Sequence, residues 1–367
     1  MSDDVSLDDP HTVPTRFWHR VEDGRVQCDA CPRACRLHEG QRGLCFVRAR
    51  VADQIVLTSY GRSSGFCLDP VEKKPLNHFL PGSSVLSFGT AGCNLACKFC
   101  QNWDISKSRE IDTLADAASP EQLARTAEAL GARSVAFTYN DPTIFLEYAA
   151  DVADACHERG ISAIAVSAGY IAPPARRELY AHVDAANIDL KAFTEDFYHR
   201  VCSAHLGPVL DTLEYLRHET SVWFEITTLL IPGRNDSDEE IDAETRWIAE
   251  RLGVDVPLHF TAFHPDYKMR DVPPTPPATL RRARRIALGN GLRHVYTGNV
   301  HDEDGGTTRC PSCGRAVVVR DWYVIRSYRV TDDGRCGECG ASLPGRYDGP
   351  CGNWGARRLP VVLTSRR

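Results

Sequence analysis

The chain has 367 residues, with 43 lysines and arginines against 49 aspartates and glutamates, and a formal net charge of −6 at pH 7. Hydrophobic residues make up 43% and charged residues 25%, which excludes an intrinsically disordered or collagen-like chain. The length predicts two or three structural units of about 100–200 residues each. The acidic total gives no general attraction for nucleic acid, which is not expected as a partner. No stretch approaches the roughly 18 apolar residues of a membrane helix, so we expect a cytoplasmic protein without a membrane partner.

The cysteine content is the most informative part of the composition. The chain contains 15 cysteines, and this odd number in a long chain argues against a secreted disulfide scaffold. Most of them fall in three groups, within residues 28–45, 93–100 and 310–339, and several pairs have the C-x-x-C spacing that lets two thiolates bind one metal. We therefore expect metal chemistry. The remaining Cys67, Cys156, Cys202 and Cys351 are expected to be packed thiols.

Strand-like and helix-like patterns alternate between the second and third cysteine groups. Buried strands are expected over 85–88, 134–138, 161–166, 186–190, 221–231 and 258–263. Helices are expected after the capping residue Ser119, and over 142–159, 237–251 and 279–288. Each gap between strands can hold a crossover helix that joins parallel neighbours. The predicted fold class is α/β, a partial parallel (β/α)6 barrel, with an open doubly wound sheet as the main alternative.

The same patterns divide the chain into three expected units. These are an N-terminal cysteine-rich segment (1–80), a barrel (81–304), and a zinc-ribbon domain with a tail (305–367). The stretch 302–306, rich in glycine and acidic residues, is expected to be a hinge before the last unit.

Two cysteine-rich ends each offer four thiolates. Near the C-terminus, Cys310, Cys313, Cys336 and Cys339 form two C-x-x-C-G knuckles, which predict a closed structural zinc site in a unit too small to be stable alone. Near the N-terminus the ligands are Cys28, Cys31, Cys35 and Cys45. We expect zinc there too, with an auxiliary iron–sulfur cluster, or unligated or redox-active thiols, as alternatives, because zinc and iron both accept four thiolates.

Three cysteines, Cys93, Cys97 and Cys100, lie within eight residues on the loop that follows the first predicted barrel strand. Three thiolates suit a cubane iron–sulfur cluster that leaves one iron open, whereas four would close the cluster. The alternatives are a zinc site completed by a distant ligand such as Cys67 or His78, and three unrelated buried thiols.

Several longer motifs accompany this triad. They are DPVEKKPL (69–76), HFLPG (78–82), GCNLACKFCQNW (92–103), YNDPT (139–143), NIDLK (187–191), LIPGRND (230–236), HPDYKM (264–269) and YTGNV (296–300). With these motifs the sequence resembles the radical S-adenosylmethionine (SAM) superfamily. More closely, it resembles the radical SAM component of the AmmeMemoRadiSam system, a relative of the pyruvate formate-lyase activating enzymes. The resemblance extends over nearly the whole chain.

The resemblance implies a cofactor pair and its ligands. In such enzymes three cysteines, here Cys93, Cys97 and Cys100, hold a [4Fe–4S] cluster whose open iron binds the amino and carboxylate groups of SAM. One electron cleaves SAM to methionine and a 5′-deoxyadenosyl radical, which abstracts hydrogen from the substrate. Phe99 matches the aromatic position near the adenine, a role compatible with simple apolar cover for the cluster. The expected cofactors are thus the cluster, SAM and zinc, and the expected partner is an electron donor such as flavodoxin or ferredoxin.

Four polar residues at predicted strand ends are candidates for binding SAM. Asn140 and Asp141 lie where related enzymes bind the SAM amino group, and the alternative is an Asx-type turn in which Asn140 caps the next helix. Ser167 is a candidate for the SAM carboxylate or ribose, or else a helix cap. His259, at the sixth strand, is a candidate for contacting SAM or substrate, although a single histidine there is more often structural.

Three charged residues are candidates for catalysis. Asp189 and Lys191 alternate along a strand and therefore point the same way, into the predicted barrel. Opposite charges facing inward must be paired or functional, so an internal salt bridge is the alternative. Glu225 on the fifth strand is a candidate inward-facing carboxylate.

The expected function is that of a radical SAM enzyme, a pyruvate formate-lyase activating enzyme-like oxidoreductase that abstracts hydrogen from a substrate. Two narrower hypotheses are glycyl-radical formation on a protein partner, and action with or on the companion proteins of the AmmeMemoRadiSam system. The alternative is a multi-zinc module that binds nucleic acid or a protein, with an inert barrel. The basic run 281–285 fits that alternative, but such a run is usually a solvated helix face.

Overall fold

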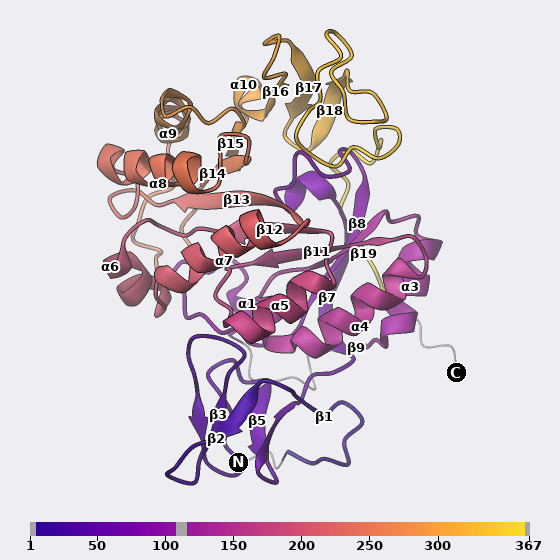
Figure 1. The fold of residues 1–367 in the computed structure, drawn as a ribbon, viewed down its shortest axis with the longest axis vertical. Helices are drawn as coiled ribbons and strands as arrows, with labels where there is room; N and C mark the ends of the chain where they lie inside the picture. Colours follow the sequence, from indigo (N-terminus) through magenta and orange to yellow (C-terminus); the bar gives the residue numbers. More distant parts are fainter. Residues whose placement is uncertain (1–4, 108–115, 364–367) are drawn as a thin grey trace.

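The computed structural model describes residues 5–107 and 116–363. Figure 1 shows small N-terminal strands at one end of the long axis, the strands of residues 308–328 at the other, and a large sheet with its helices between them. Within the described ranges no helix is long and apolar enough to cross a membrane.

The large sheet is mostly parallel. Its parallel strands lie side by side in chain order, and they are β8 (Ser84–Gly89), β10 (Ser134–Phe137), β11 (Ser162–Ser167), β12 (Ala185–Asp189), β13 (Trp223–Leu230), β14 (Leu258–Ala262) and β15 (Val295–Gly298). Antiparallel strands complete one edge, where β7 (Arg62–Pro70) pairs with β8, and β9 (Asp116–Ala117) and β19 (Leu359–Pro360) pair with β7. The predicted α/β class is confirmed. The order does not reverse along the described parallel strands, unlike a doubly wound sheet.

Helices connect the parallel strands, and Figure 1 shows α4, α5 and α7 across one face of the sheet. The principal helices are α3 (Pro120–Ala129), α4 (Leu146–His157), α5 (Pro173–Ala181), α7 (Gly207–Glu219), α8 (Asp238–Arg251) and α9 (Pro277–Gly289). Shorter helical turns are η1 (Val71–Lys73), α1 (Trp103–Ser106), η2 (Pro142–Phe145), α6 (Glu195–Phe197), η3 (Tyr198–Cys202) and α10 (Glu303–Gly306). As predicted, the Ser119 hydroxyl caps α3 by accepting the Gln122 N–H at 3.2 Å.

The helix predicted over 142–159 is two elements, η2 and α4. The Asp141 carboxylate accepts the Thr143 N–H at 3.0 Å, and Pro142 occupies the first position, so the segment begins as a tight turn. The cap is therefore Asp141 and not Asn140. Asn140, which precedes this turn, bonds the carbonyl oxygens of Thr90 and Gly92, so the turn lies beside the loop that carries Cys93.

Two small sheets form the N-terminal unit. One contains β1 (Val13–Pro14), β6 (Gln54–Leu57) and β5 (Arg48–Val51), and the other contains β2 (Trp18–Arg20), β3 (Val26–Cys28) and β4 (Arg36–Leu37). Arg48 joins this unit to the sheet, because its guanidinium makes a buried, bidentate ion pair with Glu147 of α4, at 3.2 and 2.6 Å. The N-terminal unit is thus held in a fixed position against η2 and α4.

The C-terminal unit contains β16 (Thr308–Arg309), β17 (Ala316–Asp321) and β18 (Val324–Tyr328) in antiparallel order. The prediction of a hinge at 302–306 is wrong. The stretch forms α10, whose cap Asp302 accepts the Gly305 N–H, and Arg284 of α9 pairs with Asp304 at 2.9 Å. Acidic side chains next to two glycines favoured a flexible link, but the local cap at Asp302 and the ion pair with Arg284, which only the tertiary structure provides, order it.

Candidate active site

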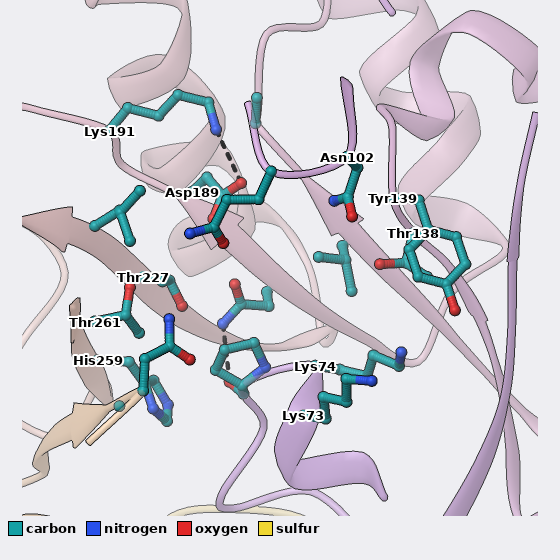
Figure 2. A pocket seen from close by; sticks show the side chains of 18 of the residues that line it. Lys73, Lys74, Asn102, Thr138, Tyr139, Asp189, Lys191, Thr227, His259 and Thr261 are labelled. Atoms are coloured by element: carbon teal, nitrogen blue, oxygen red, sulfur yellow. Dashed lines mark hydrogen bonds and ion pairs between the residues drawn. The ribbon is translucent and has the colours of Figure 1, made fainter. Parts of the chain in front are cut away.

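A cavity of about 420 Å³ opens at the carboxyl ends of the parallel strands, which is within the usual size range of ligand sites. Open α/β sheets bind ligands at this edge because the strand ends and the loops that follow them converge there. The cavity lining includes all three cysteines of the central triad. Figure 2 shows Asp189 and Lys191 on one side and Lys73 and Lys74 on the other.

The loop that carries the triad is held rigidly by backbone contacts. The N–H of Ala96 donates to Cys202 O and the N–H of Lys98 to Val201 O, both at 3.0 Å. Gly92 has φ +89°, and a Cβ at this position would lie 1.9 Å from the Cys45 carbonyl oxygen. A glycine is therefore required where the loop passes the N-terminal unit.

Replacing Gly92 with alanine is expected to lower the free energy of unfolding by about 3 kcal/mol or more, because the positive φ and the clash with Cys45 act together. Denaturant titration measures this change. Gly160→Ala is the matched control, since Gly160 has φ +67° but nothing within 4 Å of its Cβ position. That variant should lose only about 1 kcal/mol, and equal losses in the two variants would contradict the close packing at Gly92.

The three thiols have different electrostatic surroundings. Burial raises the pKa of Cys93 to about 12. A hydrogen bond from Cys202 lowers the pKa of Cys97 to about 6, and the ammonium groups of Lys191 and Lys107 act in the same direction. These cations favour the thiolate, which is the form that binds metals.

The predicted pair Asp189 and Lys191 meets inside the cavity. The Lys191 Nζ lies 2.9 Å from Asp189 Oδ2 and 5.9 Å from the centre of the Phe99 ring. Burial opposes the charge of Lys191, but the neighbouring Asp189 and thiols keep its pKa well above the usual value. From the sequence, an internal salt bridge and an active-site location were alternatives for Asp189 and Lys191. In the structure the two residues form a salt bridge and also line the cavity. The pair remains open to a ligand, because Asp189 is 37% exposed.

Asn140 and Asp141 both make hydrogen bonds within the fold. The Asn140 amide donates to the carbonyl oxygens of Thr90 and Gly92, at 2.7 and 2.8 Å, and so holds the cysteine loop. Asp141 accepts the Ala168 N–H at 2.8 Å and the Ser167 hydroxyl at 3.1 Å, besides capping η2. Asn140 and Asp141 line the cavity, whereas Ser167 lies behind its lining. The geometry gives these residues positioning roles.

Glu225 also lies behind the cavity lining. Its completely buried carboxylate accepts the backbone N–H groups of Asn77 and His78 at 3.0 and 2.7 Å, and the Trp223 indole N–H at 3.1 Å. It also bonds His259 Nε2 at 2.7 Å, and His259 does line the cavity. The catalytic role predicted for Glu225 gains no support from these contacts, which instead hold His259 in place.

A chain of aromatic and imidazole rings leads from His259 to the C-terminal unit. His259 stacks on Tyr296 with ring centres 5.0 Å apart. The Tyr296 hydroxyl bonds His78 Nε2 at 2.5 Å, and Tyr347 of the C-terminal unit bonds His78 Nδ1 at 2.9 Å. Burial lowers the pKa of His78 to about 3, so this ring is neutral at physiological pH. The C-terminal unit therefore supports the floor of the cavity.

Sequence reasoning assigned no role to several lining residues. Lys73 and Lys74 lie 3.0 and 2.9 Å from the buried Asp69, within the DPVEKKPL motif, whose two acids and two lysines were the available signal. Trp322 and Tyr323, at the turn between β17 and β18, also line the cavity. No local pattern places this turn at the cavity, because it arrives there through tertiary packing.

The C-terminal cysteines form a compact group. The sulfur atoms of Cys310 and Cys339 lie 3.7 Å apart, and those of Cys313 and Cys336 lie 3.8 Å apart. All four lie within 4.8 Å of one another. Tetrahedral ligands at about 2.3 Å from a metal ion are about 3.8 Å apart, so the group fits one four-coordinate ion.

The sequence comparisons identify the family. The model of the radical SAM superfamily matches residues 88–244, a range that begins in β8 and includes the cysteine loop, Asp189, Lys191 and Glu225. The chain belongs to the radical SAM superfamily. A curated relative, an uncharacterized protein of Methanocaldococcus jannaschii, is 37% identical over 330 residues, which cover 89% of this chain and 97% of the relative.

Several solved structures are similar at lower identity. A radical SAM methyltransferase from Sphaerobacter thermophilus has a TM-score of 0.49 and 15% identity, covering 79% of this chain and 78% of that one. A domain of the pyruvate-formate lyase-activating enzyme from Bacteroides vulgatus has a TM-score of 0.40 and 17% identity, covering 45% of this chain and 98% of that one. SuiB of Streptococcus suis, bound to S-adenosylmethionine, has a TM-score of 0.48 and 14% identity, covering 63% and 53%.

Radical SAM membership implies an enzyme with a [4Fe–4S] cluster and SAM, and the cavity fits both groups. It offers the three thiols on one rigid loop. It also contains buried polar atoms that lack a hydrogen-bond partner among the described residues, namely Gln101 Nε2, Asn187 Oδ1 and Thr227 Oγ1. Buried polar atoms without partners are costly, so their position at the cavity favours a polar ligand such as SAM.

Proposed function

We propose that this radical SAM protein cleaves SAM reductively and abstracts hydrogen from a substrate bound in the 420 Å³ cavity. The observation that carries the proposal is the presence of Cys93, Cys97 and Cys100 on one loop in the lining of a cavity that also contains Asp189 and Lys191. When bound, the cluster and SAM supply a 5′-deoxyadenosyl radical.

The protein's own residues position these groups and shield them from water. Cys93, Cys97 and Cys100 would hold the cluster, while Asn140 fixes the loop through the carbonyl groups of Thr90 and Gly92. Phe99 packs under the Lys191 ammonium and covers one side of the site. Asp189 and Lys191 offer one negative and one positive group that can orient a zwitterionic or polar ligand.

The more specific assignments are proposals supported by the motifs. The stretches YNDPT, NIDLK and HPDYKM support membership of the AmmeMemoRadiSam group, with its companion proteins as partners and a flavodoxin or ferredoxin as electron donor. Relationship to activating enzymes supports a protein substrate on which a glycyl radical is formed. We rank hydrogen abstraction from an unidentified substrate above both narrower versions.

The structural assignments that belong to this proposal follow from the strand order and the cysteines. Parallel neighbours in chain order support a partial barrel over 81–304, between units at 1–80 and 305–367. The sulfur spacing supports zinc at the C-terminal group. The cytoplasm, where low-potential electron donors and reduced thiols occur, is the proposed location.

The alternative of a multi-zinc module with an inert barrel is not favoured. Its basic run is engaged in ion pairs on the protein surface, with Arg282 3.0 Å from Asp238 and Arg284 2.9 Å from Asp304. The family match lies on the sheet that this alternative treats as inert.

The direct test is SAM cleavage by the wild-type protein. Anaerobically purified protein, reconstituted with iron and sulfide and reduced with dithionite, is expected to convert SAM to 5′-deoxyadenosine and methionine, measured by liquid chromatography. Deuterium transfer into 5′-deoxyadenosine from a deuterated protein fraction would support a protein substrate, and transfer only from deuterated small molecules would contradict it. Absence of 5′-deoxyadenosine from protein with a full, reduced cluster would overturn the proposed function.

A further inference from the structure

The N-terminal cysteines enclose a cavity of their own. Cys28, Cys31, Cys35 and Cys45 line a space of about 20 Å³. Cys28 and Cys45 are buried, and the other two are half-buried. The four side chains come from different parts of the N-terminal unit, and their convergence on one small space is the feature that needs an explanation.

The two cysteine quartets of this protein differ in size. The C-terminal sulfurs all lie within 4.8 Å of one another, as one tetrahedral ion requires. The N-terminal four, all within the described residues, do not form such a group. A cubane holds its thiolates farther apart than a single ion does, because each thiolate binds a different iron atom. The N-terminal quartet is thus less compact than one tetrahedral ion requires, and so is the triad at Cys93, which also forms no such group.

Water is a poor occupant of this space. The volume exceeds the roughly 10–15 Å³ that one water molecule needs, but a buried water also requires two to four polar partners. The lining consists mainly of thiols and apolar groups such as Ala30 and Ile144, and the Arg48 guanidinium is already bound to Glu147. A group that binds thiolates satisfies the lining better than solvent does.

The quartet lies directly against the loop of the SAM-binding cluster. Asn94 lines the quartet cavity, and its side-chain oxygen lies 3.8 Å from the Cys93 sulfur. Arg33 donates to the Asn94 carbonyl oxygen, and Gly92 packs against the Cys45 carbonyl oxygen. One residue thus separates the two thiolate sites.

We propose that Cys28, Cys31, Cys35 and Cys45 hold a second [4Fe–4S] cluster, placed beside the SAM-binding cluster through Asn94. This assignment replaces the zinc expected from the spacing alone. Four thiolates leave no open iron, so this cluster takes no substrate and can only exchange electrons. Because of its position, the redox group nearest to this second cluster would be the SAM-binding cluster on the loop of Cys93.

The test is metal content and electron paramagnetic resonance of three reconstituted variants. The first is Cys31→Ala/Cys35→Ala. The second, the triple variant, is Cys93→Ala/Cys97→Ala/Cys100→Ala. The third, the combined variant, carries all five substitutions and measures adventitious iron. Wild type is expected to contain about eight irons and one zinc per chain, and each of the first two variants about four irons. The triple variant should keep a reduced-cluster signal that SAM does not change, and wild type should show broadening from two interacting clusters.

Two outcomes would overturn the proposal of a second cluster. They are two zinc ions with about four irons in wild type, or a triple variant with no more iron than the combined variant. If the first variant fails to fold, the triple variant decides the question, since it leaves the N-terminal cysteines intact. The iron count does not depend on turnover. A triple variant with about four irons, next to a wild type that makes no 5′-deoxyadenosine, would refute the proposed function and support the second cluster.

Discussion

Replacing Cys97 with alanine is expected to reduce 5′-deoxyadenosine formation at least about a hundredfold, because only two thiolates then remain to hold the SAM-binding cluster. Cys97 is the best placed of the three ligands electrostatically, since Cys202, Lys191 and Lys107 all stabilise its thiolate. The expected effect is on cluster assembly, so the iron content and the SAM-dependent change of the reduced-cluster signal should both fall. Chromatography and electron paramagnetic resonance on the same sample measure the two effects.

Cys156→Ala is the matched control for this prediction. Cys156 is completely buried in α4, and packing explains it without any metal. Its replacement is expected to lower the free energy of unfolding by about 1 kcal/mol while leaving SAM cleavage within about twofold of wild type. A Cys97 variant with normal activity, or a Cys156 variant with the same loss of iron, would contradict the assignment of the triad.

Replacing Glu225 with glutamine is expected to lower the free energy of unfolding by about 3 kcal/mol at pH 7. Despite burial, bonds from His259 and the backbone lower the pKa of Glu225 from 4.5 to about 2, and each unit corresponds to about 1.4 kcal/mol. The unfolded chain binds the proton more tightly, so this stabilisation is present above pH 4.5 and is lost as the pH falls through about 2. The difference between wild type and variant should shrink to roughly half at pH 3.

A second buried carboxyl provides the control for Glu225. Burial raises the pKa of Glu244 on α8 to about 8, so this group is mostly protonated at pH 7, and it accepts the Thr228 hydroxyl at 2.5 Å. Glu244→Gln keeps a neutral acceptor and is expected to change the free energy of unfolding by less than about 1 kcal/mol, measured by urea titration. Equal losses for both variants, or no change of the Glu225 effect with pH, would contradict the assigned ionisation states.

Much of the sheet could be predicted from sequence because its strands are short apolar runs at regular intervals. The expected strands at 85–88 and 186–190 overlap β8 and β12. The strand β15 was missed as a strand, since its residues Val-Tyr-Thr-Gly have little apolar periodicity and are buried only by their neighbours. Short helices such as α6 and α10 were also missed, because three or four residues are too few to show a helical apolar pattern, although their caps, Thr194 and Asp302, are local.

The site was predictable where chemistry depends on local spacing. The cysteine triad needs its three ligands on one loop, so the pattern is visible in eight consecutive residues. The roles of Asn140 and Glu225 could not be predicted, because what their side chains bind depends on distant backbone groups at Gly92 and His78. Both residues are polar and were expected to face inward. Only the fold shows whether such a side chain binds a ligand or holds other residues in place.

The sequence by itself determined the superfamily, the ligand triad and the grouping of cysteines, because a metal site made by neighbouring residues is encoded in spacing. The tertiary structure decided the rest. It brought Lys73 and Trp322 to the same cavity as the triad, and it showed that the two cysteine quartets differ in size. Spacing sets how many thiolates a segment offers, whereas the distance between sulfurs, which selects an ion or a cluster, depends on how the chain folds around them.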